Sequence, residues 1–341
     1  MFILIDVSVV VPVYNSSPVI ERCIYAIKNQ QGIDSAKLEI IVVDDASTDS
    51  SATKSSALCD RLIRCPKNSG AAAARNIGAR NAQGSIIIFV DSDVILEPDA
   101  ISKFLACFEK NRGISAAVGR YSEKPANHGW INIYHNAFTG YHHDLAPKEI
   151  DWFWGALSAI KKEAFIHTGG FDERFQGASG EDLAFGKALF KKGYRIAYVP
   201  AARGGHAHDF NIFSMLENDY LKAVIGMKMK LSQLLPRQAP GFVNLRSVMT
   251  SVLLLLIPGL LLFNAVRTIP FFAAIIFLIF LTLMIINRAY YAYLSKIFDF
   301  KFKFIVPFIH WIQMYAMIAG AIMGVVGYIS GRTAFGRPKW I

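Results

Sequence analysis

The chain has 341 residues, which is enough for one large domain or two ordinary ones. Hydrophobic residues make up 53% of the sequence, above the usual level of soluble proteins. Residues 1–219 hold 23 Lys+Arg against 25 Asp+Glu, whereas residues 220–341 hold 13 basic residues and a single acid, Asp299. Because those basic residues flank apolar runs, they indicate the cytoplasmic side of a membrane protein and argue against nucleic-acid binding.

The N-terminal part predicts an α/β domain. The opening residues, MFILIDVSVVVPVYN, carry Asp6 inside an apolar run without a basic leader, so we interpret them as a strand and not as a signal peptide. Apolar strands are expected over 7–13, 39–43 and 85–90, with helical patterns between them. Strands that are apolar throughout and alternate with helices are typical of a parallel sheet covered on both faces.

Polar residues follow each of these three strands directly. Tyr14 and Asn15 end the first strand, Asp44 and Asp45 end the second, and a DSD triplet from 91 to 93 ends the third. In such sheets, ligands gather at the carboxyl ends of the strands. Two carboxylates facing one pocket suit a hard divalent cation that also binds substrate phosphates, although a plain turn would use the same residues.

The C-terminal part predicts membrane helices. Residues 247–266 and 269–287 are uncharged over the length that a helix needs to cross a bilayer, and a third uncharged stretch covers 304–330. Residues 212–235 mix apolar and basic positions, as in an interfacial or a plain surface helix. Buried core helices of a soluble protein are the alternative to membrane spans.

These patterns divide the chain into three parts. We expect a catalytic domain over 1–210, a helical linker over 211–246 and a membrane domain with two to three spans over 247–341. Basic residues before the first span and after the second satisfy the positive-inside rule if the N-terminal domain is cytoplasmic. The predicted location is therefore a cell (inner) membrane, crossed more than once.

Five motifs carry a family resemblance. VSVVVPVYN, EIIVVDDASTD, NSGAAAARNIGARNAQGSIIIFVDSD, GGFDERF and GED occur in an order that resembles family 2 glycosyltransferases of the GT-A fold, over about residues 6–210. The resemblance implies a Rossmann-like, mostly parallel sheet and transfer of a sugar from a nucleoside-diphosphate donor with inversion. The membrane helices resemble, more loosely, those of members that act on lipid-linked acceptors such as polyprenyl phosphates.

The resemblance also implies a donor site. An acidic residue at Asp45 would accept a hydrogen bond from a base with a ring N–H, as in uracil or guanine, unless it only caps a turn. Arg75 would support the nucleoside or pair with the acidic loops. The donor nucleotide-binding residues implied are Pro12, Tyr14, Asn15, Asp44, Asp45, Asn68, Gly70, Arg75, Asn76 and Asp91.

By the same resemblance, Asp91 lies near the ribose or the metal, and Asp93 ligates Mg²⁺ or Mn²⁺. One of His206 and His208 would complete the metal site, with His206 favoured because it follows a predicted strand over 194–199. An ordinary histidine without a metal remains an equal alternative.

The ED pair of GED resembles the family's catalytic acids. Asp182 would be the general base that takes the proton of the acceptor hydroxyl, with Glu181 supporting it; favourable acids at a helix start are the alternative. Residues that would line the sugar and acceptor pockets, or else form core, are Trp154, Gly155, Gly170, Phe171 and Asp172. The histidine-rich segment 127–150 matches no motif of the family.

These patterns and the resemblance together favour single-sugar transfer to a lipid-linked or glycan acceptor in cell-envelope polysaccharide or glycoconjugate synthesis. The QxxRW-type motif of processive synthases does not occur after residue 208, which disfavours polymerisation. A catalytically silent sensor or scaffold is a second alternative, disfavoured by the presence of both DxD and ED. A nucleotidyltransferase would need a basic, glycine-rich phosphate loop, which is absent from the N-terminal region. The sequence indicates no oligomeric state.

Overall fold

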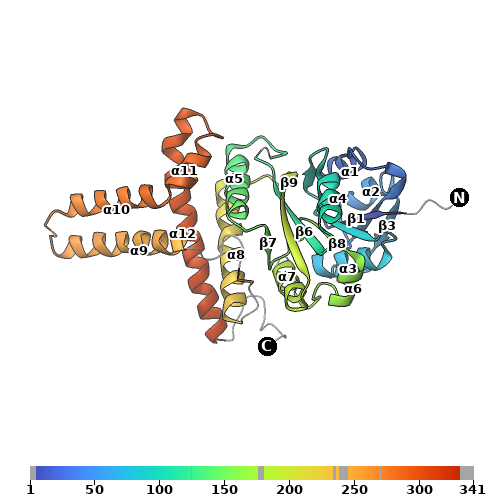
Figure 1. Cartoon of the computed structure of the whole chain (residues 1–341). Coiled ribbons are helices and arrows are strands. Elements are labelled where there is room, and N and C mark those ends of the chain that lie inside the picture. Colours follow the sequence, from blue (N-terminus) through green and yellow to red (C-terminus); the bar gives the residue numbers. More distant parts are fainter. Residues whose placement is uncertain are drawn as a thin grey trace.

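The computed structural model describes residues 5–123, 125–175, 180–232, 236–237, 245–268 and 270–330. A sheet domain occupies the N-terminal part and a group of helices the C-terminal part (Figure 1). In chain order the elements are β1 (Val7–Val13), α1 (Ile20–Lys28), η1 (Ser35–Lys37), β2 (Leu38–Asp44), α2 (Ser51–Ser56), β3 (Arg61–Arg64), α3 (Ala71–Asn81), β4 (Ile86–Val90), β5 (Val94–Leu96), α4 (Ala100–Lys110), β6 (Ile114–Tyr121), α5 (Trp130–Asp144), β7 (Glu149–Ile150), β8 (Leu157–Lys161), α6 (Lys162–Thr168), α7 (Glu181–Lys191), β9 (Arg195–His206), α8 (Ile212–Leu231), α9 (Leu245–Val266), α10 (Phe272–Ile286), α11 (Arg288–Leu294) and α12 (Phe300–Ser330).

The strands form one sheet in the order β3-β2-β1-β4-β8-β6-β9-β5, and β7 pairs with β9. The first four strands, β3, β2, β1 and β4, run parallel, as the alternation of apolar strands and helices predicts. Beyond them the sheet is mixed, because β8 runs antiparallel to both β4 and β6 whereas β9 runs parallel to β6. A strand that is buried on both faces has the same apolar pattern in either direction, so its direction is not visible in the sequence.

Helices cover both faces of this sheet. On one face, α1 and α4 contribute Ile20, Ile24 and Phe104 to a core that includes Val9 and Ile88. On the other face, the alanine-rich α3 packs with α6 and α7 against the opposite side chains of the same strands. The successive residues of β1 and β4 therefore contact different cores, which is why these strands are apolar at nearly every position.

The C-terminal helices form a separate layer beside the domain. Figure 1 shows α12 alongside α8, with α9 and α10 paired in a hairpin that projects away from the sheet. Two glycines permit the close approach of α12 to α8, because a Cβ on Gly320 would meet the carbonyl oxygen of Tyr220 and one on Gly324 would meet that of Val224. The helix predicted over 212–235 corresponds to α8, which ends at Leu231 and packs against α12; residues 233–235 lie outside the described residues.

Two of the described helices are long and apolar enough to cross a membrane, over 246–266 and 302–330. The expected span over 269–287 is divided: α10 has 15 residues, and the chain bends by 65° before α11. Asn287 lies at this break and donates to Thr250 of α9 at 3.0 Å. Taken together, α10 and α11 give a third candidate, so the described residues allow two or three spans. The last part of the predicted membrane domain, 331–341, lies outside the described residues.

Candidate active site

The three polar strand ends meet at one edge of the sheet. β1 lies between β2 and β4 and runs parallel to both, and Val13 is in register with Asp44. Pro12 is the penultimate residue of β1, so it lies beside the end of β2. Parallel strands place their carboxyl ends side by side, and the chain therefore brings its three polar clusters to a single edge as predicted from their positions.

Asp45 organises the loop before α3. Its two carboxylate oxygens accept hydrogen bonds from the backbone N–H groups of Ser69, at 2.9 Å, and Gly70, at 2.7 Å. Gly70 has a φ of +90°, a conformation that favours glycine, and it begins α3. Asp45 therefore holds the NSG loop in place beside the strand ends, whereas the side chain of Asn68 in that loop is exposed.

The loops after β1 and β2 are tied to each other. The side chain of Asn15, a residue with a φ of +48°, accepts from the backbone N–H of Thr48 at 2.9 Å. The buried Asp44 accepts from the N–H of Ser47 at 3.2 Å. Tyr14 is half exposed, so it offers an aromatic face at this edge. Tyr14 and Asn68, two of the predicted donor residues, are thus exposed side chains on loops that hydrogen bonds hold in place.

Arg75 compensates the charge of two acids. Its guanidinium contacts Asp91 at 2.7 Å and Glu181 at 2.8 Å, and only 4% of the residue is exposed. Burial alone would lower the pKa of Arg75, but Asp91 and Glu181 raise it, so it stays charged. Burial and the neighbouring Asp93 raise the pKa of Asp91, although Arg75 opposes the rise. This ion pair is one reason why two carboxylates can stand at the end of an apolar strand.

Asp93 has a different partner. Its Oδ2 lies 3.2 Å from Nε2 of His206, the last residue of β9. β9 extends through Pro200 to that histidine and pairs antiparallel with β5, where Val94 is in register with His206. Burial raises the pKa of Asp93, but the hydrogen bond and charge of His206 outweigh this and hold it below its ordinary value.

These groups offer an incomplete set of metal ligands. No three His, Cys, Asp or Glu side chains of the described residues are grouped closely enough to hold a metal ion. Asp93 and His206 together provide one carboxylate and one imidazole, which suit a divalent cation whose other ligands come from phosphate and water. Asp91 is engaged by Arg75, and His208 packs against Phe210 with ring centroids 4.2 Å apart.

Asp182 lies at the start of α7 and is held by backbone donors. It accepts from the N–H of Gly155 at 3.0 Å and of Leu183 at 2.7 Å. Burial and the adjacent Glu181 raise its pKa to about 6, while the Gly155 N–H and Arg75 oppose the rise. A Cβ at Gly155 would lie 2.6 Å from Cζ of Arg75. A side chain there would therefore disturb Arg75 and, through the Gly155 N–H, Asp182. A carboxylate with this pKa is suited to general-base chemistry near neutral pH.

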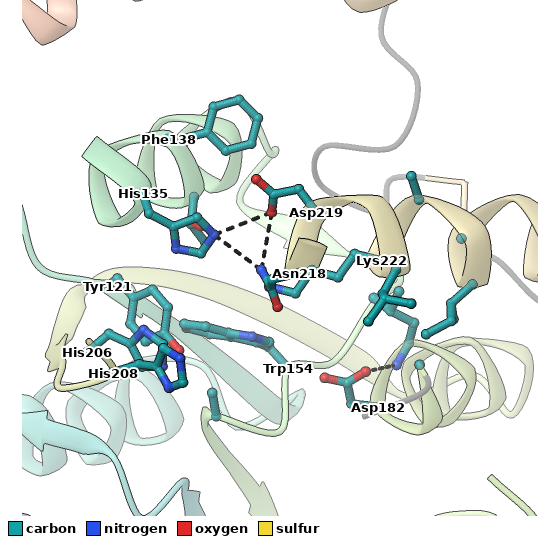
Figure 2. Close-up of a pocket in the computed structure, with 18 of the residues that line it drawn as sticks. Tyr121, His135, Phe138, Trp154, Asp182, His206, His208, Asn218, Asp219 and Lys222 are labelled. Atoms are coloured by element: carbon teal, nitrogen blue, oxygen red, sulfur yellow. Dashed lines mark hydrogen bonds and ion pairs between the residues drawn. The ribbon is translucent and has the colours of Figure 1, made fainter. Parts of the chain in front are cut away.

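A cavity of about 600 Å³ joins these groups. Asp91, Asp93, Asp182 and His206 line it on the side of the sheet, and Trp154 also lines it. Figure 2 shows that the opposite side is formed by His135, Asn218 and Asp219, which come from α5 and α8. Its volume lies within the range of small-molecule binding sites.

The GGFD segment is placed elsewhere. The ring of Phe171 is 2% exposed and packs in the aromatic core, 5.3 Å from the centroid of Phe89. Asn76 contacts the backbone of Phe171 through both ends of its amide, at 2.8 and 2.9 Å. A Cβ at Gly170 would meet the same amide, and Asp172 pairs with Arg174. The structure brings these residues to the core and surface beside α3 and does not bring them to the cavity wall.

Sequence reasoning missed several residues of the cavity wall. Tyr121 is buried and stacks on His206, with ring centroids 4.7 Å apart. His135 and His143 come from the segment 127–150, whose excess of histidines was visible but matched no motif. Asn218 and Asp219 lie in what the sequence presents as a linker helix.

Comparisons with known proteins find similarity to glycosyltransferases. Residues 8–169 match the family described as glycosyl transferase family 2, and residues 135–216 match one described as N-terminal domain of galactosyltransferase. An uncharacterized glycosyltransferase of Haemophilus influenzae is 30% identical over 188 residues, which cover 52% of this chain and 60% of that protein. The validoxylamine A glucosyltransferase of Streptomyces hygroscopicus subsp. limoneus is 26% identical over 248 residues, which cover 62% of this chain and 54% of that protein. The chain thus spans less than two thirds of the length of either relative.

The fold agrees with a solved structure. The mannosyltransferase PcManGT from Pyrobaculum calidifontis, in complex with GDP-Man and Mn²⁺, aligns with a TM-score of 0.63 over 96% of this chain and 88% of that one, at 19% identity. The sheet domain therefore has the GT-A fold. Residues 8–169 are thus similar to family 2 of the glycosyltransferases, and the relatives named above are described as glycosyltransferases.

Proposed function

We propose that this enzyme moves a single sugar, with inversion, from a UDP- or GDP-type donor to a lipid-linked or other glycan acceptor at a membrane. Its product would enter a cell-envelope polysaccharide or glycoconjugate. The observation that carries the proposal is that Asp182 and the Asp93–His206 pair line the same cavity. A general base and a pair of groups suited to a divalent cation are thus available to one bound donor.

The donor nucleotide would bind at the strand ends. The exposed Tyr14 and Asn68 flank the loops that Asp45 and Asn15 fix, and a base could lie between them. The diphosphate would then extend along the end of β4 toward Asp93. Arg75 would keep Asp91 oriented and would limit the negative charge that the diphosphate meets.

Asp93 and His206 would hold Mg²⁺ or Mn²⁺, since their oxygen and nitrogen atoms lie 3.2 Å apart on the wall of the cavity. When bound there, such a cation would neutralise the charge of the leaving diphosphate. The two side chains would leave room for phosphate oxygens and water as further ligands, which is the usual arrangement for Mg²⁺ at substrate phosphates.

Asp182 would act as the base. Its carboxylate would accept the proton of the acceptor hydroxyl while the hydroxyl oxygen bonds to the anomeric carbon and the bond from that carbon to the diphosphate breaks. The N–H groups of Gly155 and Leu183 hold the carboxylate in one orientation. Attack by the acceptor on the face opposite the leaving group gives inversion.

The hairpin of α9 and α10 would insert into the inner membrane, with the catalytic domain in the cytoplasm. Its surface is apolar and exposed, as at Leu255, Leu262, Phe263 and Phe277, which is expected of a lipid-facing surface. α12 is the second long apolar helix and packs on α8. Alkaline extraction of membranes carrying the full chain tests this placement, because an inserted hairpin stays in the membrane whereas a peripheral protein is released.

Nucleotide release tests the catalytic proposal. The detergent-solubilised full chain would be incubated with UDP- and GDP-sugars, Mn²⁺ or Mg²⁺ and a membrane lipid extract, beside the variants Asp182→Asn and Asp93→Ala. We expect metal-dependent, lipid-stimulated release from one donor, lost in both variants. Tight donor binding with release no faster than in the variants would instead favour a silent sensor.

A further inference from the structure

The proposed donor and metal sites leave one half of the cavity without an assigned role. It is formed by α5 and α8, across Trp154 from the catalytic edge (Figure 2). α5 begins after residue 129, carries His135 and His143 into the wall and belongs to the histidine-rich segment that matched no family motif. The chemistry of this half can therefore be considered separately from that of the donor.

Two buried imidazoles on α5 each have an unused nitrogen. His135 is 2% exposed and His143 is 4% exposed, and Nδ1 of each is buried without a hydrogen-bond partner among the described residues. Leaving a buried polar atom unpaired costs about 1–3 kcal/mol. Both side chains line the cavity, so their imidazole rings form part of its polar wall.

The imidazole of His135 is held by α8 and, through α8, by α12. Its Nε2 lies 3.4 Å from Oδ1 of Asp219 and 3.4 Å from Nδ2 of Asn218. Oδ2 of Asp219 accepts from Gln313 at 2.7 Å, and the Gln313 amide oxygen accepts from Tyr134. These bonds fix the polar groups of the wall relative to one another.

The charges of this wall are poorly suited to an anion. Among the described residues of α5 and α8 that line the cavity, the charged side chains are Glu217, Asp219 and Lys222. Burial lowers the pKa of His143 to about 3, and it also lowers that of His135 despite the opposing effect of Asp219, so both imidazoles are neutral. A phosphate would meet two carboxylates and one exposed ammonium group, whereas a neutral polyol would find hydrogen-bond donors and acceptors.

The rest of the wall suits a sugar ring. Phe138 and Trp154 present aromatic surface to the cavity, and apolar aromatic faces with a few placed polar groups are typical of small-ligand sites. A base at Asp182 is needed for a hydroxyl nucleophile, which must lose a proton. A phosphate monoester is largely ionised at neutral pH and has little need of one.

We infer that α5 and α8 form the acceptor subsite, and that this subsite presents a saccharide hydroxyl, and not a phosphate oxygen, to Asp182. The inference rests on the proposed transferase function, and it assigns the class of acceptor. His135 and Asp219 are positioning residues in this account, because they bind the acceptor sugar without touching the reacting atoms.

The test compares two acceptor chemistries. The full chain in detergent receives radiolabelled donor with either a panel of octyl glycosides or polyprenyl phosphate, and labelled product is measured. We expect product from at least one glycoside and none from polyprenyl phosphate. His135→Gln and Asp219→Asn should each lower kcat/KM for the glycoside by about tenfold or more, with the donor KM within about twofold of the wild type. His128 is an exposed histidine just before α5, and His128→Gln is the matched control. It should change neither kcat/KM for the glycoside nor the donor KM.

Labelled polyprenyl phosphate, formed equally well by wild type and His135→Gln, would overturn the inference while leaving the transferase proposal in place. Donor hydrolysis without product from any glycoside would also count against it. Absence of metal-dependent binding of every sugar nucleotide would remove the proposed function itself, so the two failures are distinguishable.

Discussion

At the edge formed by β1, β2 and β4, each functional group directly follows its own strand, whereas the opposite wall takes side chains from α5, α8 and α12. The edge is charged and compensated by Arg75 and His206. The wall carries two carboxylates and one ammonium group and is rich in imidazole and aromatic groups. The difference teaches that one cavity can combine a side suited to phosphates with a side suited to hydroxyl groups.

The largest expected effect is at the base. Asp182→Asn keeps the size of the side chain and one of its two acceptances from backbone N–H groups but removes the proton acceptor, so we expect transfer to fall by about 10²–10⁴-fold. Donor binding, measured by calorimetry, should stay within about twofold. Unchanged transfer would mean that Asp182 is not the general base.

The next largest effect is expected at Asp93 and His206, the proposed metal ligands. Asp93→Ala removes the carboxylate beside His206, and we expect transfer to fall by more than about 10²-fold together with weaker metal-dependent donor binding. Asp172→Ala, a partly exposed acid that pairs with Arg174 away from the cavity wall, is the control and should leave donor binding unchanged. Equal effects of the two variants would contradict the proposed role of Asp93.

The next prediction concerns the contribution of Arg75 to stability. Arg75→Ala leaves Asp91 and Glu181 without their cation, and breaking a buried pair in this way costs about 3–5 kcal/mol in the free energy of unfolding. Thermal unfolding of the full chain in detergent checks this. Arg80→Ala, in the same helix but at an exposed pair, should cost less than about 1 kcal/mol.

The pH dependence follows from Asp182. The base is active when deprotonated, and its pKa is about 6, so kcat/KM for the acceptor should fall about tenfold per pH unit below 6 and level off above it. Donor binding measured over the same range separates this from effects at Asp93 and His206. A midpoint near 4 would indicate that burial and Glu181 do not raise the pKa of this carboxyl.

The smallest effect concerns the wall. Gly320→Ala would push α12 away from the carbonyl of Tyr220, and we expect a loss of about 1–3 kcal/mol in the free energy of unfolding. Gly259→Ala in α9, where nothing lies within 4 Å of an added Cβ, is the matched control and should be neutral or slightly stabilising. Equal destabilisation by both would argue against tight packing of α8 on α12.

The sequence by itself predicted the GT-A fold, the similarity to family 2 glycosyltransferases and the strand ends that carry Asp45, Asp91 and Asp93. The reason is local: an apolar run fixes where a strand ends, and parallel strands bring their ends together. The position of Asp182 was likewise predicted by a short motif that begins a helix. The roles assigned to these residues stay predictions until the variants are measured.

Only the tertiary structure decided which residues line the cavity opposite these strand ends. The direction of β8 is not encoded in an apolar pattern, and neither is the register that places His206 beside Asp93. His135 meets Asp219 across 84 positions of sequence because α5 and α8 pack together, and Gln313 joins them from α12. Helix packing depends on side-chain shape over many residues, so a motif of a few residues cannot record it.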